Sequence, residues 1–279
     1  MIQFTKVQGL GNDFILVDGR HGGVIPDNPS RAAVLWCDRH FGIGADGLLL
    51  LLPSARADLS MRIFQPDGSE AEMCGNAIRC VALYLQQRVG TVSASLAIET
   101  LAGIKVASLL AGGLVRVDMG RPCLERGEIP MAGPPGRVLD EPLEAGGEVF
   151  RVTAVSMGNP HCLVYVPDVA LVPVTTLGPL LEHHPAFPRR TNVEFIQVDD
   201  PENVVVRVWE RGVGETLACG TGASAVAVGS FLNGFTRRSV KIKLAGGELD
   251  LEYNEDGRVY VTGPAAMVFT GQIAPIEEV

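Results

Sequence analysis

The second half of the 279-residue sequence repeats the first half at one constant offset in residue number. The aligned pairs need no gap and include Arg62 with Arg207, Glu70 with Glu215, Cys74 with Cys219, and Gly75 with Gly220. A second alignment at nearly the same offset places the Gly11-Asn12 turn on Gly158-Asn159. Internal repeats restrict the possible folds more than composition does, because each copy must form a similar unit. The sequence therefore predicts two related domains.

Apolar runs with strand character occur in the same order in both copies. They are Ile2–Val7, Phe14–Val17, Met61–Phe64, Val92–Ile98 and Leu114–Met119, then Val152–Val155, Leu163–Val166, Val204–Trp209, Val240–Leu244 and Val259–Thr262. After Cys74, apolar residues recur at helical spacing. After Cys219, residues 223–232 are apolar nearly all round, which predicts a helix buried within its own sheet.

These patterns predict an α+β protein of two pseudo-symmetric domains. Each domain is expected to be a curved, mainly antiparallel sheet wrapped around a central buried helix, with the active site in the cleft between the domains. We expect residues 1–119 to form the N-terminal domain and residues 120–265 the C-terminal domain. The last segment, 266–279, is expected to return to the first domain as a strand.

Charge and cysteine usage exclude several functional classes. A formal net charge of −9 without a Lys/Arg run argues against nucleic acid or an anionic membrane as partner, and favours a small molecule. The N-terminal residues lack the apolar core of a signal peptide, so we expect a cytoplasmic protein. The six cysteines include no CxxC pair, so the spacing predicts neither a zinc site nor disulfides, and Cys37, Cys80, Cys123 and Cys162 are interpreted as core residues.

Cys74 and Cys219 differ from the other cysteines because each precedes a glycine at the predicted start of a helix. Backbone N–H groups and the helix dipole stabilise a thiolate at that position, and can lower a cysteine pKa from about 8.5 to roughly 3.5–7.5. Gly75 and Gly220 also allow close approach of an anion such as a carboxylate. Two such cysteines in duplicated domains suggest an acid and a base that act on opposite faces of one carbon, with inversion as the result.

Six motifs resemble those of the diaminopimelate epimerase family, and together they span nearly the whole chain. They are GLGNDF at 9–14, HFGIGADG at 40–47, DGSEAEMCGN at 67–76, MGNPH at 157–161, ERGVGET at 210–216 and ACGTG at 218–222. The resemblance implies interconversion of LL- and meso-2,6-diaminopimelate, in lysine and peptidoglycan precursor synthesis, without pyridoxal phosphate or metal. It also implies a homodimer.

The resemblance assigns roles to matching positions. Cys74 and Cys219 would be the acid/base pair, and His161 and Glu210 would tune the two thiol pKa values. The reacting carboxylate would be held by the backbone at Gly75, Asn76, Gly220 and Thr221. The rest of the substrate would contact Asn12, Gln65, Asn159, Asn192, Glu210 and Arg211. Gln65 departs from the family pattern, which often has Asn there, and its longer side chain keeps a distal contact only if the backbone retreats.

Two alternatives remain open at this point. A proline or hydroxyproline racemase would also use paired Cys-Gly sites, but a cyclic imino acid has no second carboxylate for Arg211 to bind. A redox sensor or amino-acid-binding protein could hold the same thiols without catalysing proton exchange. Which of the two cysteines is ionised in the resting protein is not indicated by the motifs.

Overall fold

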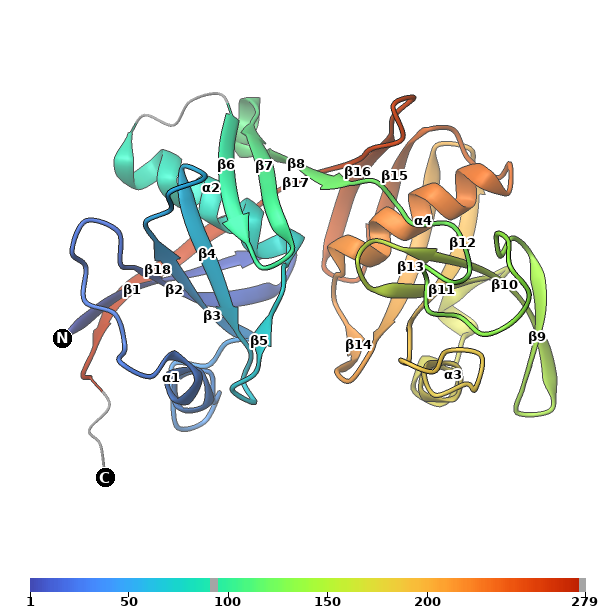
Figure 1. The fold of residues 1–279 in the computed structure, drawn as a ribbon, viewed down its shortest axis with the longest axis horizontal. Helices are drawn as coiled ribbons and strands as arrows, with labels where there is room; N and C mark the ends of the chain where they lie inside the picture. Colours follow the sequence, from blue (N-terminus) through green and yellow to red (C-terminus); the bar gives the residue numbers. More distant parts are fainter. Residues whose placement is uncertain (91–94, 276–279) are drawn as a thin grey trace. The chain divides into compact units, whose positions relative to one another are not determined.

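The computed structural model describes residues 1–90 and 95–275, and the chain forms two compact units (Figure 1). Unit 1 contains Met1–Val117 together with the C-terminal segment that starts at Gly263, and unit 2 contains Asp118–Thr262. The strands β8 (Val115–Gly120) and β17 (Val259–Gly263) cross the two boundaries.

Unit 1 is built on one mixed sheet. Its strands are β1 (Ile2–Gly9), β2 (Asn12–Asp18), β3 (Gly47–Leu52), β4 (Leu59–Phe64), β5 (Glu70–Ala71), β6 (Ser95–Thr100), β7 (Gly103–Leu109) and β18 (Ala266–Ile273). The pairing order is β18-β1-β2-β3-β4-β6-β7, and β5 pairs with β4. The pairs β2–β3 and β4–β6 are parallel, and the others are antiparallel.

Unit 2 repeats this order. Its strands are β9 (Glu141–Ala145), β10 (Glu148–Ser156), β11 (Pro160–Tyr165), β12 (Asn192–Asp200), β13 (Asn203–Glu210), β14 (Gly214–Thr216), β15 (Ser239–Leu244), β16 (Gly247–Tyr253) and β17. They pair as β9-β10-β11-β12-β13-β15-β16-β17, with β14 on β13 and parallel pairs at β11–β12 and β13–β15. The duplication seen in the sequence is therefore a duplication of topology.

A central helix packs against the sheet of each unit (Figure 1). In unit 1, α2 (Gly75–Val89) contacts β1, β7 and β18. In unit 2, α4 (Gly220–Leu232) contacts β10, β11, β12, β15 and β16, and its residues from Gly222 to Ser230 are all buried. The predicted α+β fold, with a buried helix at the centre of each sheet, is confirmed.

Several elements were not predicted from the sequence. Two further helices, α1 (Pro29–Trp36) and α3 (Val174–Glu182), and the short 3-10 helices η1 (Ala111–Gly113) and η2 (Val169–Leu171) lie in connections. Strand β6 begins at Ser95, and residues 92–94 of the strand predicted there lie outside the described residues. At the C-terminus β18 ends at Ile273, and residues 276–279 likewise lie outside them.

The cysteines outside the repeat motif are mostly core residues. Cys37, Cys80 and Cys162 are buried, whereas Cys123 is half-buried at an isolated bridge to Ser156, which corrects its assignment to the core. All six cysteines are free thiols.

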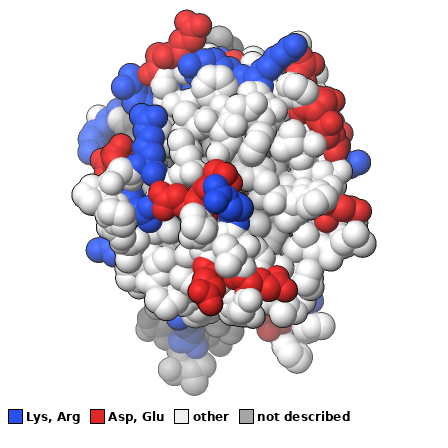
Figure 2. Space-filling model, turned by 90° about the vertical axis from the view of Figure 1, so that its right-hand side faces the viewer, with Lys and Arg blue, Asp and Glu red and all other residues white. Residues whose placement is uncertain are grey.

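On the face shown in Figure 2, basic side chains are more frequent along the left edge and acidic ones along the right edge, with uncharged residues between them. In the described part of the chain, no helix is both long enough and apolar enough to span a membrane.

Candidate functional site

The first cysteine cluster lies at the start of α2 in unit 1 and comprises Cys74, Asn12, Asn76, Arg79 and Asp46. Cys74 is the residue immediately before the helix, and its extended backbone (φ −143°, ψ 121°) ends the loop that follows β5. This geometry exposes the first N–H groups of the helix, which have no partner within the helix itself. The sequence prediction that Cys74 occupies a helix start is confirmed.

The side chain of Asn12 connects the members of this cluster. Its Oδ1 atom accepts hydrogen bonds from the Cys74 thiol, at 3.6 Å, and from Asn76 Nδ2, at 3.2 Å. Its Nδ2 atom donates to Asp46 Oδ2 at 2.9 Å, which sets the orientation of the amide. Asp46 in turn receives a hydrogen bond from Arg39 and so is held in place from the other side.

Arg79 is a fully buried cation one turn into α2. Its Nη2 atom donates to Asn76 Oδ1 at 2.8 Å, and its Nε atom donates to the carbonyl of Pro264 at 3.2 Å. Nη1 has no hydrogen-bond partner in the part of the chain that the structure describes. Burial lowers the pKa of Arg79, and the nearby Cys80 and Cys74 oppose that shift. An anion at Cys74 would therefore be stabilised by this buried charge.

The second cysteine cluster lies at the start of α4 in unit 2 and comprises Cys219, Thr221, Gly222, Glu210, His161, Glu194 and Asn159. Cys219 has the same extended backbone as Cys74, with φ −125° and ψ 114°. Its Sγ atom accepts a hydrogen bond from the Gly222 N–H at 3.4 Å and lies 3.4 Å from Thr221 Oγ1. These contacts show a thiol that is held against the helix start.

Burial and two carboxylates raise the pKa of Cys219 well above its ordinary value. Burial is the largest cause, Glu210 and Glu194 add to it, and the hydrogen bonds from Thr221 and Gly222 oppose it. Burial also raises the pKa of Glu210, against hydrogen bonds to Thr216 and Cys219. Thr216 Oγ1 donates to Glu210 Oε1 at 2.6 Å. Glu210 thus lies close enough to Cys219 to raise the pKa of its thiol.

His161 is fully buried and pairs with Glu194, a residue that the motif analysis did not identify. His161 Nδ1 lies 2.7 Å from Glu194 Oε1, and Nε2 lies 3.1 Å from Asn159 Oδ1. Asn159 Nδ2 donates to Thr221 Oγ1 at 3.3 Å. The sequence does carry a signal for Glu194, because the repeat offset aligns this acidic residue with Leu49 in an otherwise apolar strand.

Asn192 and Arg211 lie together in unit 2. The Asn192 side chain is buried, with Nδ2 donating to the Pro160 carbonyl at 2.8 Å and Oδ1 accepting from the backbone N–H of Arg211 at 2.9 Å. The exposed Arg211 side chain donates from Nη1 to the Arg189 carbonyl at 3.0 Å. Asn192 therefore fixes the backbone from which the Arg211 guanidinium extends.

The predicted residues divide between the units. Unit 1 holds Asn12, Cys74, Gly75 and Asn76 in one cluster, with Gln65 half-buried at the turn after β4. Unit 2 holds the remaining predicted residues, which are Asn159, His161, Asn192, Glu210, Arg211, Cys219, Gly220 and Thr221. In the described residues, no group of three or more His, Cys, Asp or Glu side chains could hold a metal ion.

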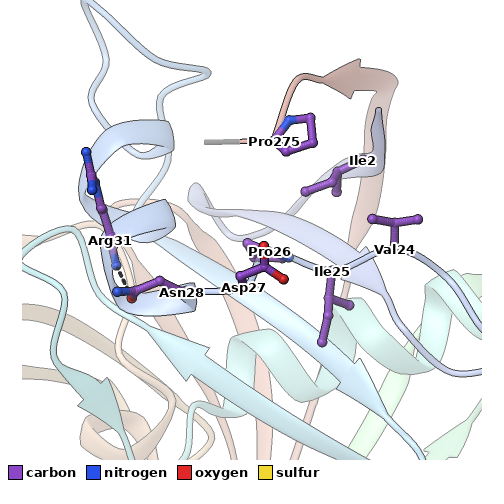
Figure 3. A pocket seen from close by; sticks show the side chains of 8 residues that line it. All are labelled: Ile2, Val24, Ile25, Pro26, Asp27, Asn28, Arg31 and Pro275. Carbon is purple, nitrogen blue, oxygen red and sulfur yellow. Dashed lines mark hydrogen bonds between the residues drawn. The ribbon is translucent and has the colours of Figure 1, made fainter. Parts of the chain in front are cut away.

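A small cavity of about 130 Å³ elsewhere in unit 1 contains none of these residues (Figure 3). It is lined by apolar side chains and three polar ones: Ile2, Val24, Ile25, Pro26, Pro275, Asp27, Asn28 and Arg31. We therefore do not assign the predicted chemistry to this cavity.

The duplicated α+β units, each with a cysteine at the start of its central helix, place the chain in a known class of folds. A hydroxyproline epimerase from Agrobacterium vitis has the same fold, with a TM-score of 0.71 and 19% identity over 98% of this chain and 90% of that chain. At this identity the likeness defines the fold alone.

Sequence comparison is more specific. The family model described as diaminopimelate epimerase matches residues 4–125 and 153–268. Proteins named diaminopimelate epimerase are 62% identical in Pelotomaculum thermopropionicum and 58% identical in Desulforudis audaxviator. Each alignment covers 97% of this chain, with 98% and 99% of the respective relatives. The chain belongs to the diaminopimelate epimerase family.

Proposed function

We propose that this protein is an isomerase that interconverts LL- and meso-2,6-diaminopimelate by proton transfer at one Cα atom. The observation that carries the proposal is that each unit places a cysteine immediately before its central helix, at Cys74 and at Cys219. Family membership supplies the substrate, since the relatives that align over nearly the whole chain carry the name diaminopimelate epimerase. It favours that substrate over a cyclic imino acid.

In the proposed reaction, one sulfur acts as base and the other as acid. A thiolate removes the proton from Cα, so that a C–H bond breaks and an S–H bond forms. The electron pair is delocalised toward the adjacent carboxylate. The second thiol then donates its proton to the opposite face, which inverts the centre and leaves that sulfur as the thiolate. The proposal requires both sulfurs to reach the same carbon from opposite sides.

The helix starts support the step in which charge develops. We propose that the backbone at Gly75 and Asn76, and at Gly220 and Thr221, binds the carboxylate next to the reacting carbon. Fixed donors aimed at developing charge are worth more than a positioned base alone, which contributes only about 10² to 10⁴-fold. We propose that these dipoles supply the larger share of the acceleration.

The remaining predicted residues are proposed to hold the distal end of the substrate. Arg211 suits the distal carboxylate because a guanidinium binds carboxylates in a bidentate manner. Glu210 suits an ammonium group, and Asn12, Gln65, Asn159 and Asn192 offer amide donors and acceptors. The reaction needs no cofactor in this proposal. We further propose a cytoplasmic homodimer that acts in lysine and peptidoglycan precursor synthesis.

Incubation with LL-diaminopimelate in deuterated buffer under reducing conditions tests the function. An epimerase incorporates deuterium at Cα of the meso product, whereas a binding protein or a redox sensor leaves the Cα proton in place. The variants Cys74→Ala and Cys219→Ala are each expected to abolish epimerisation, with correct folding checked by circular dichroism. Full epimerase activity in either variant would overturn the two-base assignment.

A further inference from the structure

The buried pair of His161 and Glu194 has an apolar counterpart in unit 1. Strands β11 and β12 pair in parallel with His161 opposite Asn192, and β2 and β3 pair in parallel with Phe14 opposite Gly47. Phe14 and His161 occupy equivalent positions, because each lies two residues after the asparagine of the repeated Gly-Asn turn. On the neighbouring strands, Leu49 lies two residues after Gly47 and Glu194 lies two residues after Asn192, so these two residues are also equivalent. Phe14 and Leu49 are 3% and 0% exposed, so both pairs occupy equally buried positions.

The fold therefore does not need an ionisable pair at these positions. Removing two charged groups from water costs several kcal/mol per ion, and a well-packed apolar pair of similar volume is often as stable or more stable. Unit 1 demonstrates such an apolar solution in the same topology. Packing does not explain why unit 2 buries Glu194 and His161.

The geometry of Glu194 points toward Cys219. A Cβ atom added at Gly222 would lie 2.6 Å from Glu194 Oε1 and 3.4 Å from Cys219 Sγ, so the carboxylate and the thiol border the same backbone position. The other carboxylate oxygen, Oε2, is buried without a hydrogen-bond partner in the described residues. Glu194 is thus a buried acid whose second oxygen is not satisfied by the unit that holds it.

A second connection runs through side chains. His161 Nε2 lies within hydrogen-bond distance of Asn159, Asn159 donates to Thr221, and Thr221 contacts Cys219 Sγ. A continuous run of polar contacts therefore connects His161 to Cys219.

The charged groups that act on Cys219 are carboxylates, whereas the cluster around Cys74 contains both the buried cation Arg79 and the carboxylate of Asp46. Within unit 2, Cys219 is acted on by Glu210 on β13 and Glu194 on β12, and Glu194 pairs with His161 on β11. Within unit 1, Cys74 lies near the buried cation Arg79, and its neighbour Cys80 is uncharged at neutral pH because burial raises its pKa to about 12. The repeat offset aligns Arg79 with Ser224, so α4 has no equivalent of this cation. The side-chain oxygen of Asn12 accepts a long hydrogen bond from the Cys74 thiol, at 3.6 Å, and this bond favours the protonated form.

We propose that Glu194, whose carboxylate borders the same backbone position as the Cys219 thiol, is a positioning residue that keeps Cys219 protonated in the resting protein, so that Cys74 is the resting thiolate. This assignment rests on the proposed function for its chemical meaning. Cys74 would then remove the first Cα proton, and the S–H bond of Cys219 would supply the proton to the opposite face. The repeat provides the two thiols, and the departure from the repeat at residues 161 and 194 makes them unequal.

Thiolate absorbance in the ultraviolet, measured against pH without substrate, tests the assignment. The variant Cys74→Ser retains Cys219, and Cys219→Ser retains Cys74. Of the other cysteines, Cys37 and Cys80 have pKa values raised to about 12, and burial also raises those of Cys123 and Cys162, so they contribute little near neutral pH. We expect Cys74 to ionise at lower pH than Cys219.

Two further changes in the Cys74→Ser background address Glu194 itself. Glu194→Gln keeps the shape of the side chain, and the double change His161→Phe with Glu194→Leu installs the pair of unit 1. Each is expected to lower the pH midpoint of Cys219 by about one unit or more, because a like charge near a thiol opposes its ionisation. Glu194→Gln in the Cys219→Ser background is expected to leave the midpoint of Cys74 unchanged.

Glu182→Gln is the matched control. Glu182 is another buried carboxylate of unit 2, bonded to Trp209 and the Gly212 N–H, and it does not act on the Cys219 thiol. We expect no change of the Cys219 midpoint in this variant. Because Glu194→Gln alone decides the role of the charge, the test does not depend on folding of the double variant.

The proposal is overturned if Cys219 ionises at lower pH than Cys74, or if its midpoint is the same with Gln at position 194. The deuterium assay separates this outcome from failure of the function. A protein that exchanges deuterium but shows the opposite order of ionisation keeps the proposed function and loses the present assignment. A protein in which Cys74 ionises before Cys219 but which exchanges no deuterium keeps the present assignment and loses the proposed function.

Discussion

The buried side chain of Asn192 fixes the backbone of the exposed residue Arg211. Asn192 uses both ends of its side-chain amide on backbone groups, one of them the N–H of Arg211, so the backbone at this turn is held while the guanidinium extends to the surface. A fixed backbone lowers the entropy lost when the side chain binds an anion. The arrangement suits a residue that measures the length of a substrate.

Arg211→Ala is therefore expected to raise KM for diaminopimelate strongly, by roughly 10-fold or more, since a charge-assisted pair contributes on the order of 1.5 to 3 kcal/mol. Deuterium exchange into an α-amino acid without a distal carboxylate should change little. Arg211→Lys keeps the charge but not the bidentate geometry, and its KM for diaminopimelate is expected to lie between those of the unchanged protein and Arg211→Ala. Equal losses with both substrates would show that Arg211 does not bind the distal carboxylate.

At the scale of elements, the repeat predicted most of what holds the two cysteines. The strands before each cysteine, the helix after it and the equivalence of Cys74 and Cys219 follow from aligned residues and are present in the structure. Strand β3 was not predicted, because its leucines are buried on both faces and show no alternation. The helix α1 was missed because its eight residues give too short an apolar period, although Asn28 and Pro29 form a recognisable N-cap and first turn.

The site was predicted less completely than the fold. Family motifs predicted roles for His161 and Glu210, whereas Glu194, for which we propose a role, lies in none of the six motifs quoted for the family. A single acidic residue within an apolar strand is ordinarily assigned to the solvent face. Its burial depends on the parallel pairing of β11 with β12, a long-range feature that local periodicity does not encode.

In each unit, an ion pair between an arginine and a glutamate at equivalent positions holds the short strand that precedes the cysteine. Arg62 forms two bonds to Glu70, at 2.7 and 2.8 Å, and Arg207 bonds to Glu215 at 2.8 Å. The two arginines align in the sequence repeat, and in the structure they join β4 to β5 and β13 to β14. Arg207 also donates to the carbonyls of Val169 and Val172. Among the contacts of the described residues, Arg62 has no equivalent pair of bonds.

The additional bonds of Arg207 predict that replacement by methionine lowers the free energy of unfolding more at position 207 than at position 62. Arg62→Met is expected to cost about 0 to 1 kcal/mol in the free energy of unfolding, as partly exposed ion pairs usually do. Arg207→Met should cost about 1 to 3 kcal/mol, because two carbonyls lose their donor as well. Urea unfolding of the two variants measures both values. A larger loss for Arg62→Met would contradict the contribution assigned to the carbonyls of Val169 and Val172.

At the scale of the whole molecule, the two units differ in how the chain builds them. Unit 2 is continuous, whereas unit 1 combines the N-terminal residues with the C-terminal strand β18. Strand β18 pairs with β1 from Ile2 to Gln8, and Phe269 packs edge-on against Phe4 with ring centroids 6.0 Å apart. Unit 1 therefore cannot be complete until the last part of the chain is present.

Ending the chain after Ala265 removes β18 while retaining the Pro264 carbonyl that accepts from Arg79. The backbone bonds of β1 to β18 are each worth about 0.5 to 1.5 kcal/mol net, so their joint loss is large compared with a typical stability of 5 to 15 kcal/mol. We expect amide hydrogen exchange to accelerate in β1, β2 and α2 but to remain slow in β12, β13 and α4. A chain ended after Ile273 keeps the strand and serves as the control. Unchanged protection of β1 in the shorter chain would show that β18 covers unit 1 without stabilising it.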